Sequence, residues 1–208
     1  MMKRIHASDL KTIQRCPTLS RLVREHGQET NDAADFGIQV HKAIEQAYNT
    51  KCMPHDIPPQ VVPYVLAAEK YFPTSGLAEY AWRGEYKGLL FGGTIDLLAR
   101  NFLLDWKTGR YKVDIESDIQ AVLYSFFIQR PIRFIYLRDD TVQVRMAATG
   151  EDMDKYVMPY ARAAHNLPVI QNRTACYQFR KPCQFVSECG RGAFDCLERK
   201  EFVPWEGI

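Results

Sequence analysis

Residues 91–109 read FGGTIDLLARNFLLDWKTG and contain two apolar, strand-like runs that each carry an aspartate. Asp96 lies between apolar neighbours in the first run, and Asp105 and Lys107 lie two residues apart at the end of the second. Because side chains alternate along a β-strand, Asp105 and Lys107 point to the same face. If the two runs pair, Asp96 can approach that face. We therefore expect two carboxylates and an ammonium group to converge at one end of a sheet.

Two carboxylates placed in this way form a site for a hard divalent cation such as Mg²⁺ or Mn²⁺. The cation lowers the pKa of bound water and neutralises charge on a phosphate, and a lysine can orient the attacking water. Phosphodiester hydrolysis uses this chemistry. The alternative is a plain ion pair between Asp105 and Lys107, since an Asp-x-Lys triplet alone occurs by chance in many chains. The apolar setting of Asp96 favours metal, because an unpaired buried carboxylate is costly.

A helix predicted over residues 31–49 supplies a candidate nitrogen ligand. Gly37, His41 and Glu45 are four residues apart and therefore lie on one helical face. The glycine would let this helix approach another backbone, and a neutral imidazole is a good ligand for manganese-like metals. A lone histidine in such a position is more often structural than a ligand, so both interpretations stay open.

Gln120 and Tyr124 share one face of a helix predicted over residues 116–129. They could contact a phosphate backbone or support Lys107. Taken alone, such a pair is more often an ordinary part of a helix surface.

Hydrophobic periodicity predicts helices first, then a run of strands, then alternating helices and strands. The expected fold class is α/β, with a central mixed sheet flanked by helices, in a single domain over residues 1–208. We divide this domain into a helical N-terminal part (1–75), a catalytic core (76–165) and a cysteine-rich part (166–208). The predicted helices span 8–25 with a bend or restart at Pro17, 31–49, 60–72, 116–129 and 151–165, and the predicted strands span 77–87, 89–99, 102–106, 132–137 and 141–147.

The composition is that of an average soluble protein: 208 residues, 46% hydrophobic, and a net charge of +2 from 27 basic and 25 acidic residues. It excludes disordered and fibrous chains. The sequence has no apolar run of the ~20 residues that span a bilayer and no secretory signal, so we expect no membrane and a cytoplasmic location. Both ends are locally basic, which suits either a solvated surface or a rim that holds a polyanion.

The motifs occur in an order that resembles the RecB-like branch of the PD-(D/E)XK nucleases. They are Gly-x-x-x-His, Gly-x-x-Asp, Asp-Trp-Lys-Thr-Gly and Gln-x-x-x-Tyr. Ser8 to Cys16-Pro17 is similar to the first helix of that branch, and Glu79 is similar to a glutamate found there. The resemblance implies a restriction-endonuclease-like core and roles for the motif residues. His41, Asp96, Asp105 and the Trp106 carbonyl would bind metal, Lys107 would be catalytic, and Gln120 and Tyr124 would complete the site and contact DNA.

The same resemblance implies a Mg²⁺- or Mn²⁺-dependent DNA nuclease that attacks in line and leaves a 5′-phosphate. We expect an exonuclease on single strands or DNA ends rather than an endonuclease. It would act in phage or mobile-element recombination or in CRISPR-type adaptation, with other proteins of those processes as partners, in a bacterial, archaeal or phage-infected cell. Two alternatives remain: a catalytically weak module that binds DNA ends, and a hydrolase of RNA or a dinucleotide.

Four of the six cysteines lie in the last 33 residues, which in a cytosolic protein points to metal or redox chemistry before disulfides. The resemblance to iron–sulfur members of the branch, the CRISPR adaptation nuclease and the AddB nuclease domain, implies a 4Fe-4S cluster on Cys16, Cys176, Cys183 and Cys189. Cys196 could replace any of the last three. Zinc and no metal are the alternatives, because four thiolates also bind zinc.

Overall fold

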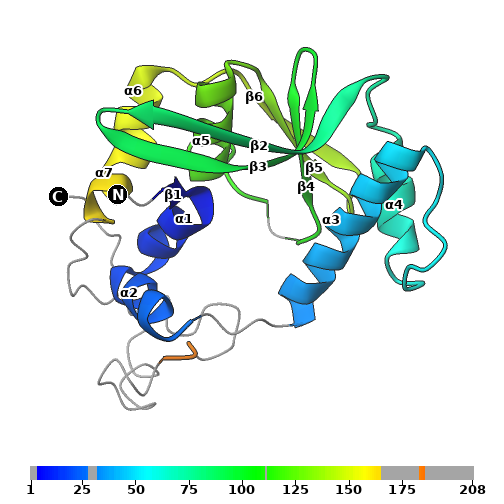
Figure 1. Ribbon diagram of the computed structural model, residues 1–208, viewed down its shortest axis with the longest axis horizontal. Helices are drawn as coiled ribbons and strands as arrows, with labels where there is room; N and C mark the ends of the chain where they lie inside the picture. The colour runs from blue at the N-terminus through cyan, green and yellow to red at the C-terminus, as the bar shows by residue number, and fades with distance from the viewer. Residues whose placement is uncertain (1–3, 28–31, 111, 165–182, 186–208) are drawn as a thin grey trace.

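The computed structural model describes residues 4–27, 32–110, 112–164 and 183–185. Its centre is a six-stranded mixed sheet in the order β1-β3-β4-β5-β6, with β2 paired to β3 (Figure 1). The pairs β1–β3 and β4–β5 are parallel, and the other pairs are antiparallel. The strands are β1 (Ile5–His6), β2 (Gly76–Tyr86), β3 (Leu89–Ala99), β4 (Leu103–Lys107), β5 (Ile132–Tyr136) and β6 (Thr141–Arg145).

The long hairpin of β2 and β3 is fixed by its turn. Lys87 and Gly88 both have positive φ angles, of 48° and 76°, which is the conformation of a two-residue type I′ turn. Such a turn matches the twist of the flanking strands and sets their register. The register runs from Tyr86 opposite Leu89 to Gly76 opposite Ala99, so the predicted hairpin is confirmed.

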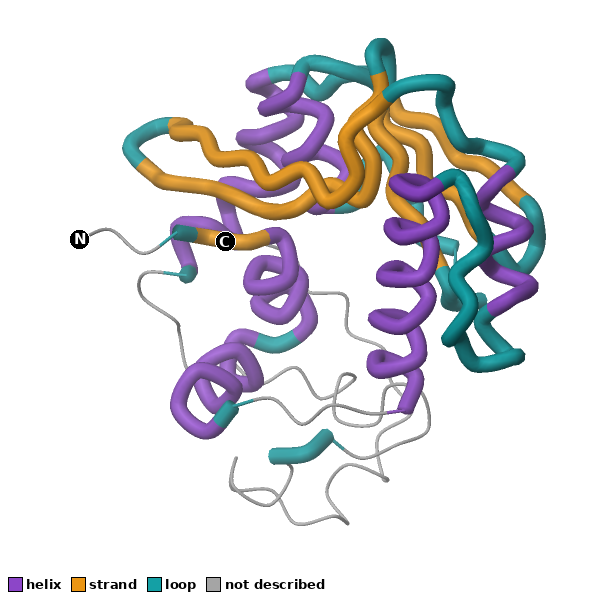
Figure 2. The backbone as a smooth tube through the Cα atoms, turned by 45° about the vertical axis from the view of Figure 1, so that its right-hand side comes forward, coloured by secondary structure: helices purple, strands orange, loops and turns teal. Residues whose placement is uncertain are grey.

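Helices cover both faces of the sheet, as the views in Figures 1 and 2 show. One face packs against α3 and α4, and the other packs against α1, α5, η1 and α7. The α/β fold with helices on both sides of a mixed sheet agrees with the prediction. The helical elements are α1 (Ala7–Arg15), α2 (Pro17–His26), α3 (Asp32–Thr50), α4 (Val62–Glu69), α5 (Ile119–Ile128), α6 (Gly150–Asp152), the π-helical turn η1 (Met153–Val157) and α7 (Met158–Ala163).

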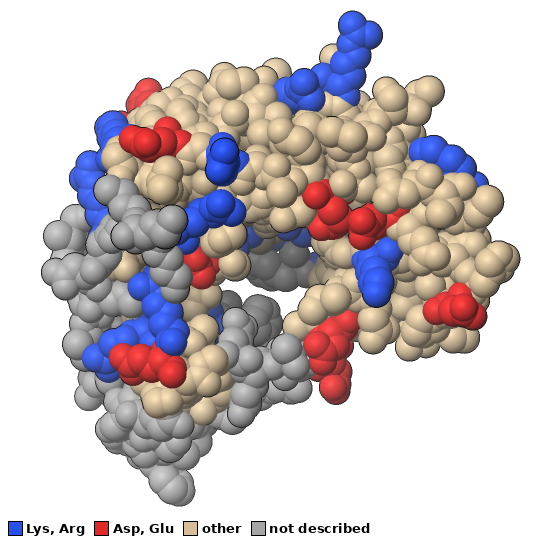
Figure 3. All heavy atoms as spheres, in the orientation of Figure 1, with Lys and Arg blue, Asp and Glu red and all other residues tan. Residues whose placement is uncertain are grey.

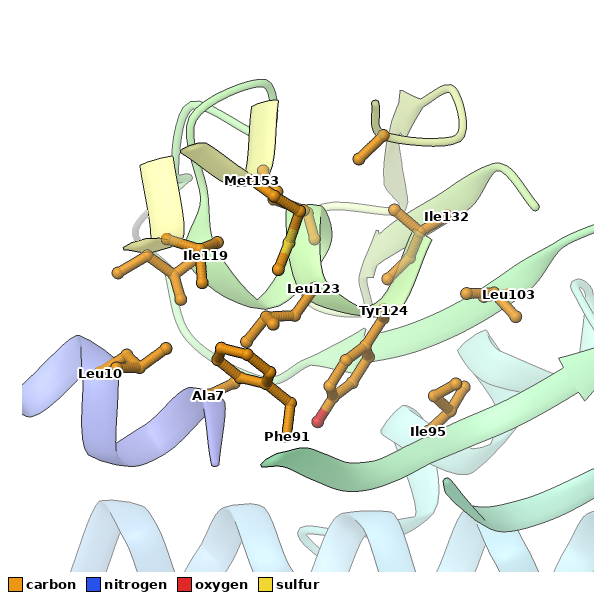
Figure 4. Packing of buried hydrophobic residues seen from close by; sticks show 14 of the residues in the cluster. Ala7, Leu10, Phe91, Ile95, Leu103, Ile119, Leu123, Tyr124, Ile132 and Met153 are labelled. Carbon is orange, nitrogen blue, oxygen red and sulfur yellow. The ribbon is translucent and has the colours of Figure 1, made fainter. Parts of the chain in front are cut away.

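The first apolar core lies between β3 and α5. Phe91 is fully buried, and Trp82 and Tyr124 are nearly so. Figure 4 shows the Tyr124 hydroxyl directed from α5 toward β3, between Phe91 and Ile95. Trp82 and Phe91 therefore stabilise the core and are not available to stack against bases.

The N-terminal segment differs from the prediction in one respect. Residues Ile5–His6 form a short parallel strand against β3, and α1 begins directly after it. The helix is capped by His6, whose backbone N–H donates to the Asp9 carboxylate at 3.1 Å. At the other end the predicted restart is confirmed, because α1 stops at Arg15 and α2 starts with Pro17, which fits the first turn of a helix.

Both strands of the hairpin change the face they present near the middle of the sheet. On β2, Tyr80 and Trp82 pack with the α5 side, whereas Ala78 packs with the α3 side. Strict alternation would place all three on one face. Glu79, between them, has a φ of 49°, in the left-handed region that few residues with a side chain adopt. The turn of the backbone at Glu79 therefore redirects the strand.

The same change occurs opposite, on β3. Ile95 packs with the α5 side and Leu97 with the α3 side. The register places Asp96 across from Glu79, and the backbone pairing of the two strands skips these two residues. A break in the ladder thus brings two carboxylates together at the α3 side of the sheet.

Within the ranges that the structure describes, no helix is long and apolar enough to span a membrane. The predicted helix over 151–165 is realised as α6, η1 and α7 in succession. Cys176, Cys189 and Cys196 lie outside the described residues. The prediction of a single domain over 1–208 therefore stays a prediction.

Candidate active site

Asp96 is held by two groups from different elements. Its Oδ1 lies 3.2 Å from Nδ1 of His41 on α3, and its Oδ2 accepts a hydrogen bond of 2.7 Å from the backbone N–H of Trp106 on β4. The antiparallel pairing of β3 with β4 is formed at Leu97 and Leu98 only. At Trp106 a carboxylate therefore takes the place that a β3 carbonyl would have in a continued ladder. The helix, the hairpin and β4 together fix this aspartate.

Glu79 completes a group of three possible metal ligands. One ligand atom each from His41, Glu79 and Asp96 lies within 4.8 Å of the others. Asp105 does not belong to this group, although the resemblance implies it as a ligand, and its role stays a prediction. The Trp106 side chain is buried, and the proposed metal contact of its carbonyl is likewise untested.

The charges in this group are incompletely balanced. Burial and the negative charges of Asp96 and Glu45 raise the pKa of Glu79 to about 7. Burial lowers the pKa of His41, but the hydrogen bond and charge of Asp96 outweigh it and raise this pKa to about 9. His41 is therefore protonated at neutral pH and acts as the counter-ion of Asp96. A divalent cation would replace that proton and relieve the repulsion between the carboxylates.

The three residues fit a hard divalent cation. Two carboxylates and an imidazole are the oxygen and nitrogen donors that Mg²⁺ and Mn²⁺ accept, and Mn²⁺ takes imidazole more readily. All three side chains line one open pocket of about 470 Å³, together with Ala34, Gly37, Ile38, Lys42 and Glu45. The pocket leaves space for a substrate phosphate and water. The donor set thus supports the predicted metal type without distinguishing Mg²⁺ from Mn²⁺.

The space-filling view shows the molecule hollowed beneath the sheet, between the side that carries α1 and α2 and the side that carries α3 (Figure 3). Acidic side chains lie along the edge of the hollow near α3. Gly37 on α3 lies next to Thr108, and a Cβ added to Gly37 would be 3.5 Å from the Thr108 hydroxyl oxygen. That distance is an ordinary contact, so the close backbone approach expected for Gly37 is not what the structure shows.

Asp105 and Lys107 point to the same face of β4, as the alternation predicts. Asp105 is 2% exposed, and its Oδ2 forms an ion pair with the Lys107 ammonium. Burial raises the pKa of Asp105, and the positive charge of Lys107 opposes this. Burial lowers the pKa of Lys107, but the Asp105 charge more than compensates and raises it. Lys107 Nζ also lies 4.1 Å from the centre of the Phe134 ring, over its face.

Gln120 joins the pair from the first turn of α5. Its Nε2 donates to Asp105 Oδ1 at 2.6 Å, and its Oε1 accepts from Lys107 Nζ at 3.1 Å. Tyr124 lies one turn further along the helix, where burial raises the pKa of its hydroxyl, which therefore stays protonated. The structure thus brings Gln120 to Asp105 and Lys107, as the sequence pattern suggested. The Tyr124 ring packs edge-on against Trp82, and its hydroxyl hydrogen-bonds with the Gln120 side chain.

Three residues of this region were not predicted as site residues. The sequence indicated only that Glu79 is similar to a glutamate of the family, without a role. Asp118 precedes an apolar helical run, which is the signal of a helix cap, and its side chain accepts from the backbone N–H groups of Gln120 and Ala121. Lys11 donates to Gln120 Oε1 at 3.1 Å and pairs with Asp118 at 3.0 Å. No sequence signal points to Lys11, because its contacts are with residues more than a hundred positions away.

Among the proposed cluster ligands, the structure describes Cys16 and Cys183. Cys16 is buried at the junction of α1 and α2, and Cys183 is partly exposed. Gln184, next to Cys183, donates to the Gly27 carbonyl at 3.4 Å, at the end of α2. Residues 183–185 therefore lie beside the end of α2, and the cluster stays a prediction.

No protein-family model matches the sequence, and a search of curated proteins gives no match. The solved structures that are similar to the chain include the following two. A candidate exonuclease from Eubacterium rectale has a TM-score of 0.57 and 12% identity, over 90% of this chain and 93% of its own. A protein named SSO0001 has a TM-score of 0.50 and 14% identity, over 91% of this chain and 87% of its own. At these identities the similarity shows the fold alone, which is a nuclease-like mixed α/β fold.

Proposed function

We propose that this protein is a divalent-metal-dependent nuclease that hydrolyses phosphodiester bonds in DNA. One observation carries the proposal: the ligand atoms of His41, Glu79 and Asp96 lie within 4.8 Å of one another at a break in the sheet. Asp105 and Lys107 lie on the strand whose Trp106 amide binds Asp96. A fold shared with a candidate exonuclease supports the same reaction class.

The chain's own residues would divide the reaction between them. His41, Glu79 and Asp96 hold the cation, and Asp105 is a further ligand if the resemblance to the RecB-like branch holds. The bound Mg²⁺ or Mn²⁺ supplies charge neutralisation at the phosphate and lowers the pKa of water. Lys107 orients the attacking water and stabilises the negative charge that develops on the phosphate. The water oxygen would form a bond to phosphorus as it loses a proton to solvent, and the bond from phosphorus to the 3′ oxygen would break. One product would then carry a 5′-phosphate and the other a 3′ hydroxyl that takes up a proton.

The finer assignments follow from the resemblance. We infer an exonuclease that acts on single strands or DNA ends, in phage or mobile-element recombination or in CRISPR-type adaptation, in the cytoplasm.

The test is cleavage of end-labelled DNA in the presence of Mn²⁺, with wild type beside Asp105→Ala. Single-stranded DNA, duplex DNA and RNA serve as substrates. We expect a product ladder from one end of single-stranded DNA and none from the variant. Cleavage of RNA but not DNA would move the assignment to another phosphodiester hydrolase. DNA binding without cleavage of any substrate by the wild type would favour the end-binding module.

We also propose the 4Fe-4S cluster on Cys16, Cys176, Cys183 and Cys189. It is supported by the buried position of Cys16 and by the contact of Gln184, next to Cys183, with Gly27 at the end of α2. Protein purified without oxygen should be brown, with broad absorbance near ~400 nm from thiolate-to-iron charge transfer. A colourless preparation with stoichiometric zinc, or with no metal, would remove the cluster and leave the nuclease proposal standing.

A further inference from the structure

Lys11 connects the first helix to the candidate active site. It lies on α1, and its ammonium reaches α5, where it is 3.1 Å from Gln120 Oε1 and 3.0 Å from Asp118 Oδ2. The Lys11 side chain is 35% exposed and that of Asp118 is 6% exposed. Asp118 is itself fixed, because it accepts from the backbone N–H groups at 120 and 121 at 3.0 Å each. The position of Lys11 is therefore set by the rigid first turn of α5.

Gln120 is the residue that Lys11 can control. A glutamine side chain has one oxygen that accepts and one nitrogen that donates, and the two can exchange places by a rotation of the amide. Oε1 accepts from both Lys11 and Lys107, whose ammonium groups cannot accept in return. The rotated amide would aim its N–H groups at two cations. Two ammonium groups on one oxygen therefore fix the direction of the amide.

The direction of this amide matters because of what lies on its other side. Nε2 donates to Asp105 Oδ1 at 2.6 Å. Asp105 Oδ2 in turn pairs with Lys107. Gln120 thus bridges Asp105 and Lys107. Its bond to Asp105 requires the amide orientation that Lys11 and Lys107 favour as donors and that Asp105 favours as an acceptor.

We propose that Lys11 is a positioning residue, which locks the Gln120 amide and through it holds Asp105 and Lys107 in register for catalysis. This role rests on the proposed nuclease function but makes a structural claim that can be tested without it. Lys11 would not touch the substrate. Two other roles compete with this one: a tie between α1 and α5 that serves stability alone, and a direct contact to a substrate phosphate.

A double-mutant cycle on cleavage separates these roles. The variants are Lys11→Met, Gln120→Ala and the two combined, with Lys70→Met as a matched control, since Lys70 forms an exposed ion pair with Asp140. We expect Lys11→Met to lower kcat about 10- to 100-fold with KM nearly unchanged, as losses of supporting contacts do. In the Gln120→Ala background the same change should have no further effect. Lys70→Met should leave kcat as in the wild type.

The proposal would be overturned if the kcat losses of Lys11→Met and Gln120→Ala multiply in the combined variant. A change in KM alone for Lys11→Met would overturn it as well. Lys11→Arg keeps a cation that can donate and should restore most of kcat. If Lys11→Met does not fold, Lys11→Met/Asp118→Asn removes the cation without leaving a buried charge. Asparagine still caps the helix, so this variant answers the same question.

A second measurement does not depend on activity. The side-chain amide of Gln120 in ¹⁵N-labelled protein should give two separate proton resonances with slow exchange. We expect Lys11→Met to shift and broaden both, and Lys70→Met to leave them unchanged. Unchanged resonances in Lys11→Met would overturn the positioning role. If the resonances respond but the wild type cleaves nothing, the nuclease proposal fails and the role of Lys11 in fixing Gln120 stands.

Discussion

A single backbone conformation creates the candidate metal group. Glu79 has a φ of 49°, and the pairing of the hairpin skips it and Asp96. A left-handed conformation at a residue with a side chain costs roughly 1–3 kcal/mol, and such residues cluster at functional sites. The charge at Glu79 adds to this cost, since its carboxylate lies close to those of Asp96 and Glu45. The site therefore reduces stability in order to collect acidic ligands.

The charge of Glu79 is the part of this cost that glutamine removes. We therefore predict that Glu79→Gln stabilises the metal-free protein at alkaline pH. In the folded protein the pKa of Glu79 is about 7, above the ordinary value of 4.5. Between pH 4.5 and pH 7 the folded chain therefore binds more protons than the unfolded chain does. Stability then falls as pH rises through this window, and glutamine removes the loss. Thermal unfolding in chelator should show a higher midpoint for the variant at pH 8 and nearly equal midpoints at pH 4. Glu69→Gln, at an exposed position on α4, is the control; an equal shift at both pH values would contradict the assignment.

The sequence predicted much of this site but not all of it. His41, Asp96, Asp105 and Lys107 could be found because each lies in a short pattern tied to one helix or strand. Gln120 followed from helical spacing. Lys11 could not be found, because its partners belong to a helix that packs against α1 only in the folded protein. The grouping of Glu79 with Asp96 also depends on tertiary structure, since the change of face on β2 and β3 breaks the alternation on which sequence reasoning relies.

At the scale of elements, α5 and β3 approach each other closely at Gly93. A Cβ at this position would lie 3.0 Å from the Tyr124 hydroxyl oxygen, 3.1 Å from Tyr124 Cε1 and 3.3 Å from Trp82 Nε1. Tyr124 and Trp82 are nearly fully buried and pack edge-on, so neither can withdraw freely. The glycine of the Gly-x-x-Asp motif thus lets the helix that carries Gln120 sit directly on the strand that carries Asp96.

We therefore expect Gly93→Ala to destabilise the protein by about 1–3 kcal/mol, the usual cost of an extra methyl group in a packed core. Denaturant unfolding monitored by tryptophan fluorescence measures this change. Gly109→Ala is the matched control, because a Cβ at Gly109 meets no atom within 4 Å. Equal midpoints for Gly93→Ala and the wild type would show that α5 and β3 are less tightly packed than described.

At the scale of the whole molecule, one buried arginine ties the far edge of the sheet to the helices. Arg145 on β6 is 4% exposed, donates to the Glu116 carbonyl at 3.1 Å, and lies 3.1 Å from Asp152 Oδ1. Asp152 also accepts from the Thr149 backbone N–H at 2.8 Å at the start of α6. The Thr149 backbone hydrogen bond and Arg145 lower the pKa of Asp152. These contacts join β6, the segment before α5 and the last helices.

Asp152→Asn should therefore cost about 1–3 kcal/mol at pH 7, as for hydrogen bonds to charged groups. A carboxyl whose folded pKa is depressed contributes stability above its unfolded pKa, 3.8, and loses it as pH falls through the folded value. The difference between wild type and variant should shrink accordingly below pH 4. Asp154→Asn is the control, since Asp154 pairs with Lys87 at the exposed surface and such pairs contribute little. A difference that persists undiminished in acid would contradict this account.

The metal group at the break in the hairpin is the feature on which the proposed function depends, and calorimetric titration with Mn²⁺ tests it most directly. Wild type and Asp96→Asn are titrated at pH 7.5 after removal of metals. Asp140→Asn is the control, because Asp140 pairs with Lys70 and Tyr71 at the exposed surface and does not belong to the metal group. We predict one Mn²⁺ site per chain in the wild type and in Asp140→Asn, with proton release on binding because His41 must lose its proton. Asp96→Asn should show no binding at this site. Equal Mn²⁺ affinity in Asp96→Asn and the wild type would contradict the assignment of His41, Glu79 and Asp96 as the metal centre.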